Sequence, residues 1–314
     1  MIVRQSLADV PPGERAVALG SFDGVHRGHQ AVIGNAGSEA DARGLRSAVI
    51  TFHPPPIAIL RPDIQLIQLS TLSRRAALVA ELGVDELVIL RFDRAFSTID
   101  ADAFASQVLA GKLGARHVSV GENFHYGRGA KGTPAKLAED GARLGFDVHV
   151  EPLLQGGGGT ISSSRIRELL GAGAVEEAAE LLGRPPWLEG AVVRGDGRGR
   201  ELGYPTANLA LVPRSPVPGI GIYAGTAHLP GSSHPAAISV GYNVTFTDDR
   251  SRVRVEAYLL DFDADIYGSP IRLDLTHRLR DELRFDSVDA LLDQLHRDVE
   301  AVRTLARFLT RSRR

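Results

Sequence analysis

Short apolar runs recur along the first half of the chain, separated by longer and more polar stretches. The runs are rich in Val, Ile and Leu and show little alternation between apolar and polar positions. Strands that are apolar on both faces are typical of a parallel sheet covered by helices on each side. The pattern therefore predicts a doubly wound α/β domain. The predicted strands cover residues 16–22, 47–52, 86–92, 117–121 and 147–152.

The segments between these runs carry helix signals. Thr133 and Pro134 form an N-cap followed by proline at the first helical position, and Gly145 stands where a C-cap is expected. Thr98 is the predicted cap of another helix, which would run to about Leu109.

The pattern changes after Pro185 and Pro186, which disfavour continuation of a helix. Gly- and Pro-rich turns then separate apolar strands with no helix between them, which predicts a small antiparallel β-barrel. A long amphipathic helix closes the chain, with Asp286 or Ser287 as its cap. We therefore expect two domains, at 1–184 and 185–314. The predicted barrel strands are 188–193, 222–228, 236–241, 253–262 and 271–279, and the apolar face of the helix comprises Val288, Leu291, Leu292, Leu295, Val299, Val302 and Leu305.

The composition excludes several functional classes. The 314 residues carry 36 Lys and Arg against 38 Asp and Glu, a net charge of −2 that gives no support to nucleic acid or an anionic membrane as partner. The absence of cysteine excludes disulfides, thiolate metal sites and a thiol nucleophile. No apolar run approaches the roughly 20 residues that span a bilayer, and no signal peptide is apparent. We expect a soluble cytoplasmic protein that binds small molecules, as a monomer or a weak homo-oligomer.

A candidate phosphate site follows the first predicted strand, where residues 20–29 read GSFDGVHRGH. A strand end that leads into a helix N-terminus is where open α/β sheets bind phosphates, and His26 and His29 would share one face of that helix. Imidazoles there would stabilise charge on a transferred phosphorus. Two other interpretations remain open: a structural turn with capping histidines, and a metal site with His53 as third ligand.

A second anion-binding signal lies at 161–167, which reads ISSSRIR after a glycine run. Hydroxyls and arginines at a helix start suit an anion, but the segment alone fits an N-capped surface helix better, and only its combination with the histidine motif favours the anion.

The second half carries its own constellation in residues 195–208, which are dense in glycine and charge. Thr206 and Asn208 would face one ligand in an extended segment, and their oxygens suit Mg²⁺ held jointly with nucleotide phosphates. A plain hairpin turn would have a similar composition. Glu256 lies on an apolar strand, and by propensity alone it is more often a solvated edge residue than part of a site.

Together these segments resemble one family. GSFDGVHRGH, ISSSRIR and the segment 121–132 are similar to the nucleotidyltransferase half of the bacterial bifunctional riboflavin kinase/FMN adenylyltransferases, also called FAD synthetases. The second half resembles their riboflavin kinase domain over nearly all of 186–305. The resemblance implies a Rossmann-like nucleotidyltransferase domain followed by a kinase barrel. It also implies phosphorylation of riboflavin to FMN and adenylylation of FMN to FAD, both with ATP and Mg²⁺.

The resemblance also implies roles for individual residues. In the first domain, His26 and His29 would contact the triphosphate, Ser163, Ser164 and Arg165 would hold its β- and γ-phosphates, and Asn123 would help to hold the substrates. In the second, Glu256 would orient the riboflavin hydroxyl and take its proton, while Thr206 and Asn208 would hold Mg²⁺. The remaining implied binding residues are Gly20, Phe22, Asp23 and Gly24 in the first domain, and Gly195, Arg198, Gly203 and Pro205 in the second.

Some positions depart from the family's pattern. Pro55 stands where histidine is usual, Asn123 where aspartate is usual, and Ser164 where threonine is usual. Tyr242 and Val244 alter the family's GxNPTF segment in the second domain. These departures leave two alternatives: a monofunctional riboflavin kinase with an impaired first domain, or a non-catalytic, flavin-binding regulatory module.

Overall fold

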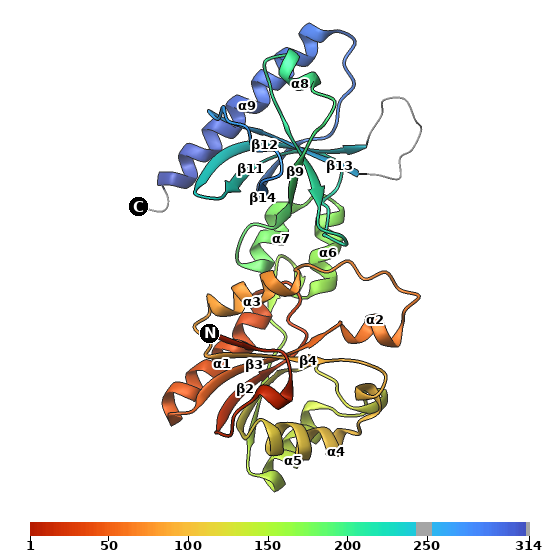
Figure 1. The fold of residues 1–314 in the computed structure, drawn as a ribbon, viewed down its shortest axis with the longest axis vertical. Coiled ribbons are helices and arrows are strands. Elements are labelled where there is room, and N and C mark those ends of the chain that lie inside the picture. The colour runs from red at the N-terminus through yellow and green to blue at the C-terminus, as the bar shows by residue number, and fades with distance from the viewer. Residues whose placement is uncertain (243–252, 312–314) are drawn as a thin grey trace. The chain divides into compact units, whose positions relative to one another are not determined.

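The computed structural model describes residues 1–242 and 253–311, except for the side chains of Arg198 and residues 309–311. The chain divides into two compact units, Met1–Ser163 and Ser164–Arg314 (Figure 1). The domain boundary at 184/185, which rests on Pro185 and Pro186, stays a prediction.

The first unit is built on a six-stranded parallel sheet, as predicted. Its strand order is β1-β4-β3-β2-β5-β6, and every neighbouring pair is parallel. The edge strand β1 is additional to the prediction, because its three residues are too few to form an apolar run. The strands are β1 (Ile2–Arg4), β2 (Arg15–Leu19), β3 (Arg46–His53), β4 (Glu86–Arg91), β5 (Ala115–Gly121) and β6 (Asp147–Glu151).

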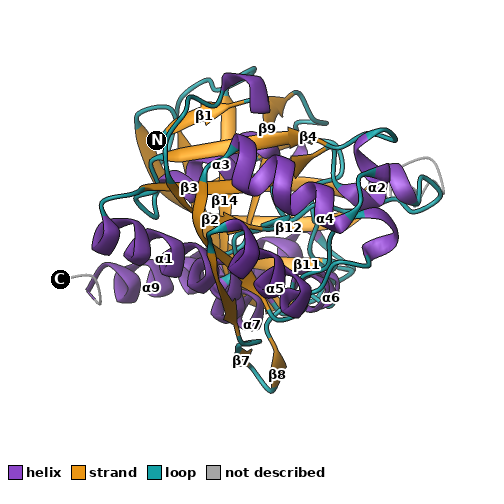
Figure 2. Ribbon diagram, turned by 90° about the horizontal axis from the view of Figure 1, so that it is seen from below, coloured by secondary structure: helices purple, strands orange, loops and turns teal. Residues whose placement is uncertain are grey.

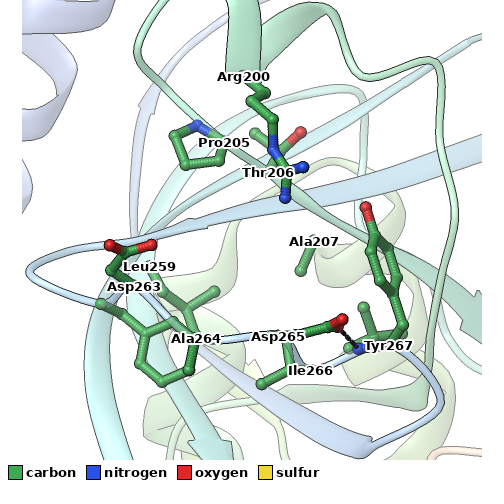
Figure 3. A pocket seen from close by; sticks show the side chains of 12 residues that line it. Arg200, Pro205, Thr206, Ala207, Leu259, Asp263, Ala264, Asp265, Ile266 and Tyr267 are labelled. Carbon is green, nitrogen blue, oxygen red and sulfur yellow. Dashed lines mark hydrogen bonds between the residues drawn. The ribbon is translucent and has the colours of Figure 1, made fainter.

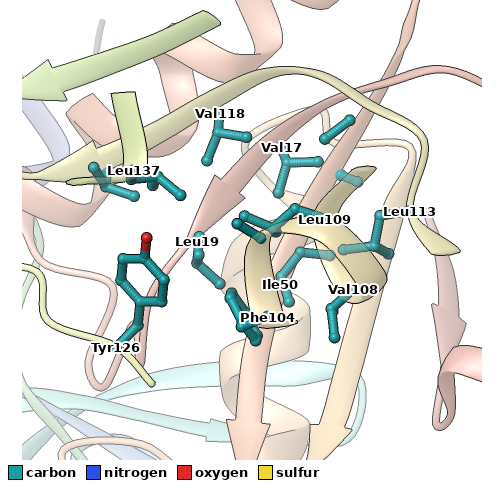
Figure 4. Close-up of a cluster of buried hydrophobic side chains, with 14 of the residues drawn as sticks. Val17, Leu19, Ile50, Phe104, Val108, Leu109, Leu113, Val118, Tyr126 and Leu137 are labelled. Carbon is teal, nitrogen blue, oxygen red and sulfur yellow. The ribbon is translucent and has the colours of Figure 1, made fainter. Parts of the chain in front are cut away.

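Helices cover both faces of this sheet. Alternate residues of β2 point to opposite faces: Val17 and Leu19 pack with the π-helix Phe104–Lys112, while the small side chains of Ala16 and Ala18 leave room on the other face. Figure 4 shows the first of these layers, with Ile50 of β3 beside Leu19. The helices are α1 (Arg27–Arg43), α2 (Pro56–Leu60), α3 (Leu72–Ala80), α4 (Ala101–Ala103), which runs on into the π-helix, and α5 (Pro134–Leu144), with 3-10 turns at Leu7–Asp9, Phe96–Thr98 and Arg128–Ala130.

Two of the predicted caps can be compared directly with the structure. Thr133 caps α5, since its hydroxyl accepts a hydrogen bond from the Lys136 N–H at 3.2 Å. The prediction for Thr98 was wrong: the helix begins only after Asp100, and the Thr98 hydroxyl donates back to the Ala95 carbonyl at 2.7 Å. A threonine hydroxyl bonds equally well to a preceding carbonyl, so residue type alone does not locate the cap.

Beyond the sheet, β7 (Gln155–Gly156) and β8 (Gly159–Thr160) form a small separate hairpin (Figure 2).

The second unit contains the predicted closed antiparallel barrel, in the order β10-β13-β12-β11-β14-β9. It also contains two elements that the sequence does not predict, the strand β10 and a short helix, α8 (Arg198–Glu201). Both lie in the glycine-rich block, whose turn-like composition obscured them. The strands are β9 (Trp187–Val193), β10 (Ala207–Leu211), β11 (Gly221–Leu229), β12 (Ser232–Tyr242), β13 (Val253–Leu259) and β14 (Pro270–Arg280).

The closing helix α9 (Val288–Arg311) lies against β11 and β12. The Ser287 hydroxyl accepts a hydrogen bond from the Ala290 N–H at 3.2 Å, so Ser287 is the cap. Val299 and Val302 are buried against Ala224 of β11, with Leu305 packed beside them, which confirms this part of the predicted apolar face. The prediction was wrong for Val288, which lies in the first turn of the helix and is 57% exposed.

Two further helices, α6 (Ser163–Gly171) and α7 (Val175–Leu182), precede the barrel and pack on it. Arg278 of β14 anchors them: its guanidinium donates to the Ala172 carbonyl at 2.7 Å, and its backbone N–H donates to the Glu176 carboxylate at 2.9 Å. The Gly219 N–H donates to the Leu170 carbonyl at 2.8 Å. The two helices are thereby fixed to β14 and to the start of β11.

Candidate functional site

The first candidate site lies where the strand order of the parallel sheet reverses. From β2 the chain proceeds to β3 on one side, whereas β5 pairs with β2 on the other. Ligands of open α/β sheets bind at such a point, beyond the carboxyl ends of the strands. The loop and helix start that carry His26 and His29 follow β2, and the loop that carries Asn123 follows β5. The topology therefore places both predicted loops at the same edge of the sheet.

The two histidines are stacked on each other at the start of α1. Their ring centroids are 3.5 Å apart with an interplanar angle of 17°, and the edge of Phe22 meets His29 at 5.3 Å. His26 is the N-cap, and its Nδ1 accepts the His29 N–H at 3.3 Å. A side chain at Gly28 would press on the His26 ring. The capping interpretation therefore holds for His26, and the same geometry gathers two imidazoles at a helix N-terminus, where an anion is favoured.

Asp23 and Arg75 hold this loop in shape. The Asp23 carboxylate accepts the N–H groups of Leu69 and Ser70, each at 3.1 Å, and pairs with Arg75 at 3.4 Å. Arg75 also donates to the Ser21 carbonyl at 2.8 Å. Burial lowers the pKa of the Arg75 guanidinium, and the Asp23 charge opposes that shift. These contacts of Asp23, predicted as a ligand-binding residue, tie the loop to the start of α3.

Replacement of Arg75 by methionine is expected to destabilise the first unit by about 2 to 3 kcal/mol, because a buried carboxylate loses its cationic partner. The two backbone N–H groups that remain on Asp23 limit the loss. Urea unfolding followed by circular dichroism measures the change. Asp23→Asn in the Arg75→Met background should then recover part of the loss; no recovery would contradict a charge-based cause.

Ser163 brings the second predicted segment to the same loop. Its hydroxyl donates to the Asp23 carbonyl at 2.9 Å. Ser164 and Arg165 follow it in the chain as the next residues of α6. The described residues contain no group of three His, Asp or Glu side chains placed to hold a metal ion, so the interpretation with His53 as third ligand gains no support.

An aromatic cavity of about 220 Å³ opens beside the same sheet edge. Burial raises the pKa of Tyr126 to about 12, so this phenol stays protonated, and its buried hydroxyl has no hydrogen-bond partner within the described residues. Gly132 exchanges two backbone hydrogen bonds with Tyr126, which closes the segment that begins at Gly121. Six aromatic side chains are among the residues that line the cavity: Phe52, Phe92, Phe96, Phe104, His125 and Tyr126.

The second candidate site lies on β10 and β13 of the barrel. Asn208 lies directly opposite Glu256 in the ladder between these strands, so their side chains share a face. The Thr206 hydroxyl donates to Glu256 Oε2 at 3.0 Å. Arg254 Nε donates to Asn208 Oδ1 at 2.9 Å and lies 3.0 Å from Glu256 Oε1. The structure thus brings together Thr206, Asn208 and Glu256, and adds an arginine.

The glycine loop before β10 fits closely around Asn208. A Cβ at Gly195 would overlap the Asn208 amide, and one at Gly199 would overlap the Tyr204 carbonyl. Gly203 has φ +82°, in the left-handed region. The side chain of Arg198 lies outside the described part of the chain. The loop therefore needs glycine for close backbone approach, beyond what a surface turn requires.

Replacement of Gly195 by alanine is expected to displace the Asn208 side chain and to lower kcat/KM for the kinase reaction by about ten- to a hundredfold, since small misplacements of positioning groups are costly. Steady-state assays with varied MgATP measure the effect. The matched control is Gly197→Ala, in the same loop at φ +76° with no atom near the added Cβ. Equal losses in both variants would show that a general disturbance of the loop, rather than contact with Asn208, is responsible.

A cavity of about 270 Å³ borders Thr206 (Figure 3). Pro205, Thr206 and Arg200 lie on one side of it and the segment 263–267 on the other. Thr206 lines this cavity, whereas Glu256 and Asn208 are not among its lining residues.

Sequence reasoning missed three features of these sites. No local sequence pattern links Arg75 to Asp23, because the two residues are 52 positions apart. Arg254 stands two residues before Glu256 on one strand, and that spacing on a shared face was a usable signal. The rings of the aromatic cavity are scattered in sequence and meet only in the fold.

The two residues that depart from the family's GxNPTF segment can be compared with the structure only in part. Tyr242 is exposed at the end of β12, whereas residues 243–246, which include Val244, lie outside the described residues.

Comparison with known proteins assigns each half of the chain to a protein family. Residues 10–165 match the family model described as FAD synthetase, and residues 182–306 match the one described as riboflavin kinase. A bifunctional riboflavin kinase/FMN adenylyltransferase from Listeria monocytogenes is 38% identical over 292 residues, covering 92% of this chain and 91% of that protein. The protein of the same name from Bacillus subtilis is 37% identical over 290 residues, covering 91% of each.

A solved structure supports the fold assignment. The protein from Streptococcus pneumoniae titled "Macrolide-efflux Protein" has a TM-score of 0.86 and 34% identity, covering 96% of this chain and 98% of that one. In this chain, no helix within the described residues is long and apolar enough to cross a membrane. The matches confirm the resemblance seen in the motifs, and the chain belongs to the bifunctional riboflavin kinase/FMN adenylyltransferase family.

Proposed function

We propose that this chain phosphorylates riboflavin to FMN in its second unit and adenylylates FMN to FAD in its first, using ATP in both reactions. The observation that carries the proposal is the presence of two separate constellations in one chain. One is the stacked histidine pair at the helix N-terminus of α1, and the other is the Thr206–Asn208–Glu256 cluster of the barrel. The family models match the two halves in the same order.

In the kinase reaction, the oxygen of the riboflavin 5′-hydroxyl attacks the γ-phosphorus of ATP. The bond from that phosphorus to the bridging oxygen breaks and ADP leaves. Glu256 orients the hydroxyl and takes its proton, which suits a carboxylate because phosphoryl transfer is loose and the proton leaves late. The hydrogen bond from Thr206 fixes one carboxylate oxygen. The cavity beside Thr206 would take the nucleotide.

Magnesium is part of the proposal, with Thr206 and Asn208 as its protein ligands. Hydroxyl and amide oxygens are hard donors, and a site with few carboxylates suits an ion that reaches the protein bound to phosphates. The residues present fit that ion, which when bound would neutralise charge on the phosphates.

In the adenylyltransferase reaction, a phosphate oxygen of FMN attacks the α-phosphorus of ATP, and pyrophosphate leaves. No protein nucleophile is required, so catalysis consists of positioning and charge stabilisation. His26, His29 and the N–H groups at the start of α1 would stabilise the charge on phosphorus. The aromatic cavity would take the flat isoalloxazine, with Asn123 in the neighbouring loop. The roles of Ser163, Ser164 and Arg165 on the β- and γ-phosphates stay predictions.

The test is a single incubation of the pure chain with riboflavin, ATP and Mg²⁺, with the flavins separated by chromatography over time. We expect FMN to appear first and FAD to follow. FMN without FAD would support the monofunctional alternative that Pro55 suggests, and a parallel incubation with supplied FMN would then show no pyrophosphate. Flavin binding without ATP consumption would support a regulatory module and would overturn the proposal. The predicted cytoplasmic location and weak or absent self-association stay predictions.

A further inference from the structure

Arg254 is the cation that contacts the Thr206–Asn208–Glu256 cluster of the barrel. Its Nε donates to Asn208 Oδ1 at 2.9 Å and lies 3.0 Å from Glu256 Oε1, and its NH1 donates to Asp196 Oδ2 at 3.0 Å. These oxygens come from three elements: β10, β13 and the glycine loop before β10. One guanidinium therefore joins the elements that form the candidate kinase site.

The oxygens that Arg254 engages are those that the proposed function needs. Asn208 Oδ1 is the proposed magnesium ligand, and Glu256 is the proposed acceptor of the riboflavin proton. The other oxygen of Glu256 accepts the Thr206 hydroxyl, so both carboxylate oxygens are already engaged by the protein. A divalent ion bound to Asn208 would lie within a few ångströms of the guanidinium, and the two like charges would repel each other.

We propose that Arg254 is an internal cation that competes with Mg²⁺ for Asn208 and Glu256 and keeps the kinase site closed until the metal–nucleotide complex arrives. The inference rests on the proposed function. Displacement of the Arg254 guanidinium, when Mg²⁺ and ATP bind, would free Glu256 Oε1 for the riboflavin hydroxyl. Because only the displaced state binds the metal, the contacts of Arg254 raise the Mg²⁺ concentration that binding requires. Arg254 is thus a positioning residue that acts through Glu256 and Asn208.

The test is the Mg²⁺ dependence of nucleotide binding in Arg254→Gln, which removes the charge and keeps a similar length. Titration calorimetry with a non-hydrolysable ATP analogue at a series of Mg²⁺ concentrations gives the half-saturating Mg²⁺ concentration without turnover. The proposed ATP site of the first unit contributes equally in every variant, because all the substitutions lie in the second unit, so a difference from the wild type reports the kinase site. We expect it to fall by about five- to tenfold, the size expected from losing two partly exposed ion pairs. Arg254→Lys, which keeps the charge, should stay closer to the wild type.

The matched control is Arg272→Gln. Arg272 also lies on a barrel strand and pairs with an aspartate, Asp274 at 2.9 Å, and its side chain is 29% exposed against 28% for Arg254. Its Mg²⁺ requirement should not change. Thermal unfolding of all variants verifies that the barrel is intact.

Two results would overturn the inference. One is an unchanged or higher Mg²⁺ requirement in Arg254→Gln. The other is a large loss of nucleotide affinity at saturating Mg²⁺, which would make Arg254 a phosphate ligand instead. If the wild-type chain bound nucleotide without any dependence on Mg²⁺, the magnesium role of Asn208 would fail along with the inference, so the two failures are distinguishable.

Discussion

Replacement of Glu256 by glutamine is expected to lower FMN formation about a thousandfold, within the range that loss of a general base produces. Glutamine keeps an oxygen that can accept the Thr206 hydroxyl, whose hydrogen bond to Glu256 measures 3.0 Å, but it cannot take a proton from riboflavin. FAD formation from supplied FMN should stay within about twofold of the wild type, because the substitution removes no group of the proposed adenylyltransferase site.

Both rates are measured by chromatography on the same preparation. The FAD-forming rate, which should stay intact, then shows that the variant is folded. A fall in kcat with KM for MgATP nearly unchanged would identify a chemical rather than a binding role. Residual FMN formation above about a tenth of the wild-type rate would remove Glu256 as the base.

Replacement of His29 by alanine should have the opposite profile. We expect FAD formation from FMN to fall about a hundred- to a thousandfold, the loss typical of one donor that stabilises transition-state charge. FMN formation should persist, so that riboflavin with ATP and Mg²⁺ accumulates FMN and stops there. The rate of pyrophosphate release from FMN and ATP measures the effect.

The control for this substitution is His149→Ala, in the same unit. His149 lies on β6, which β5 separates from β2 in the sheet, and pairs with Glu151 at 3.1 Å. Its replacement should leave both activities intact. If the His149 variant lost FAD formation to the same degree, general destabilisation of the unit would explain the result for His29.

Local patterns predicted the elements that are long and strongly apolar. The five predicted runs of the first half correspond to β2 to β6. Four of them, β2 to β5, are buried on both faces, so their apolar residues alone identify them as strands. The edge strand β6 has no fully buried residue. Two short strands were not predicted. β1 has only three residues, and β10 follows a glycine-rich block that fits closely around Asn208 and whose composition is typical of a turn. In both cases tertiary contacts, rather than propensity, decide the conformation.

The candidate sites could be predicted only where chemistry and spacing coincide in one segment. The histidine pair and the Thr206–Asn208 pair each lie within four consecutive residues, so their shared face follows from local geometry. The contacts that hold these side chains in place do not follow from local geometry. Asp23 meets Arg75, and Asn208 meets Arg254, across 52 and 46 positions of the chain. Such pairs depend on strand order and register, which a single sequence does not reveal.

The anchoring of α6 and α7 by Arg278 bears on how the two activities are to be separated experimentally. A recombinant fragment starting at residue 185 would lack both helices, which would uncover the surface of β14 beneath α7 and strip the Arg278 N–H of its acceptor on Glu176. Starting at residue 164 retains the helices with the barrel. Truncation at the Pro-Pro junction should therefore give a less soluble and more protease-sensitive product than truncation some twenty residues earlier.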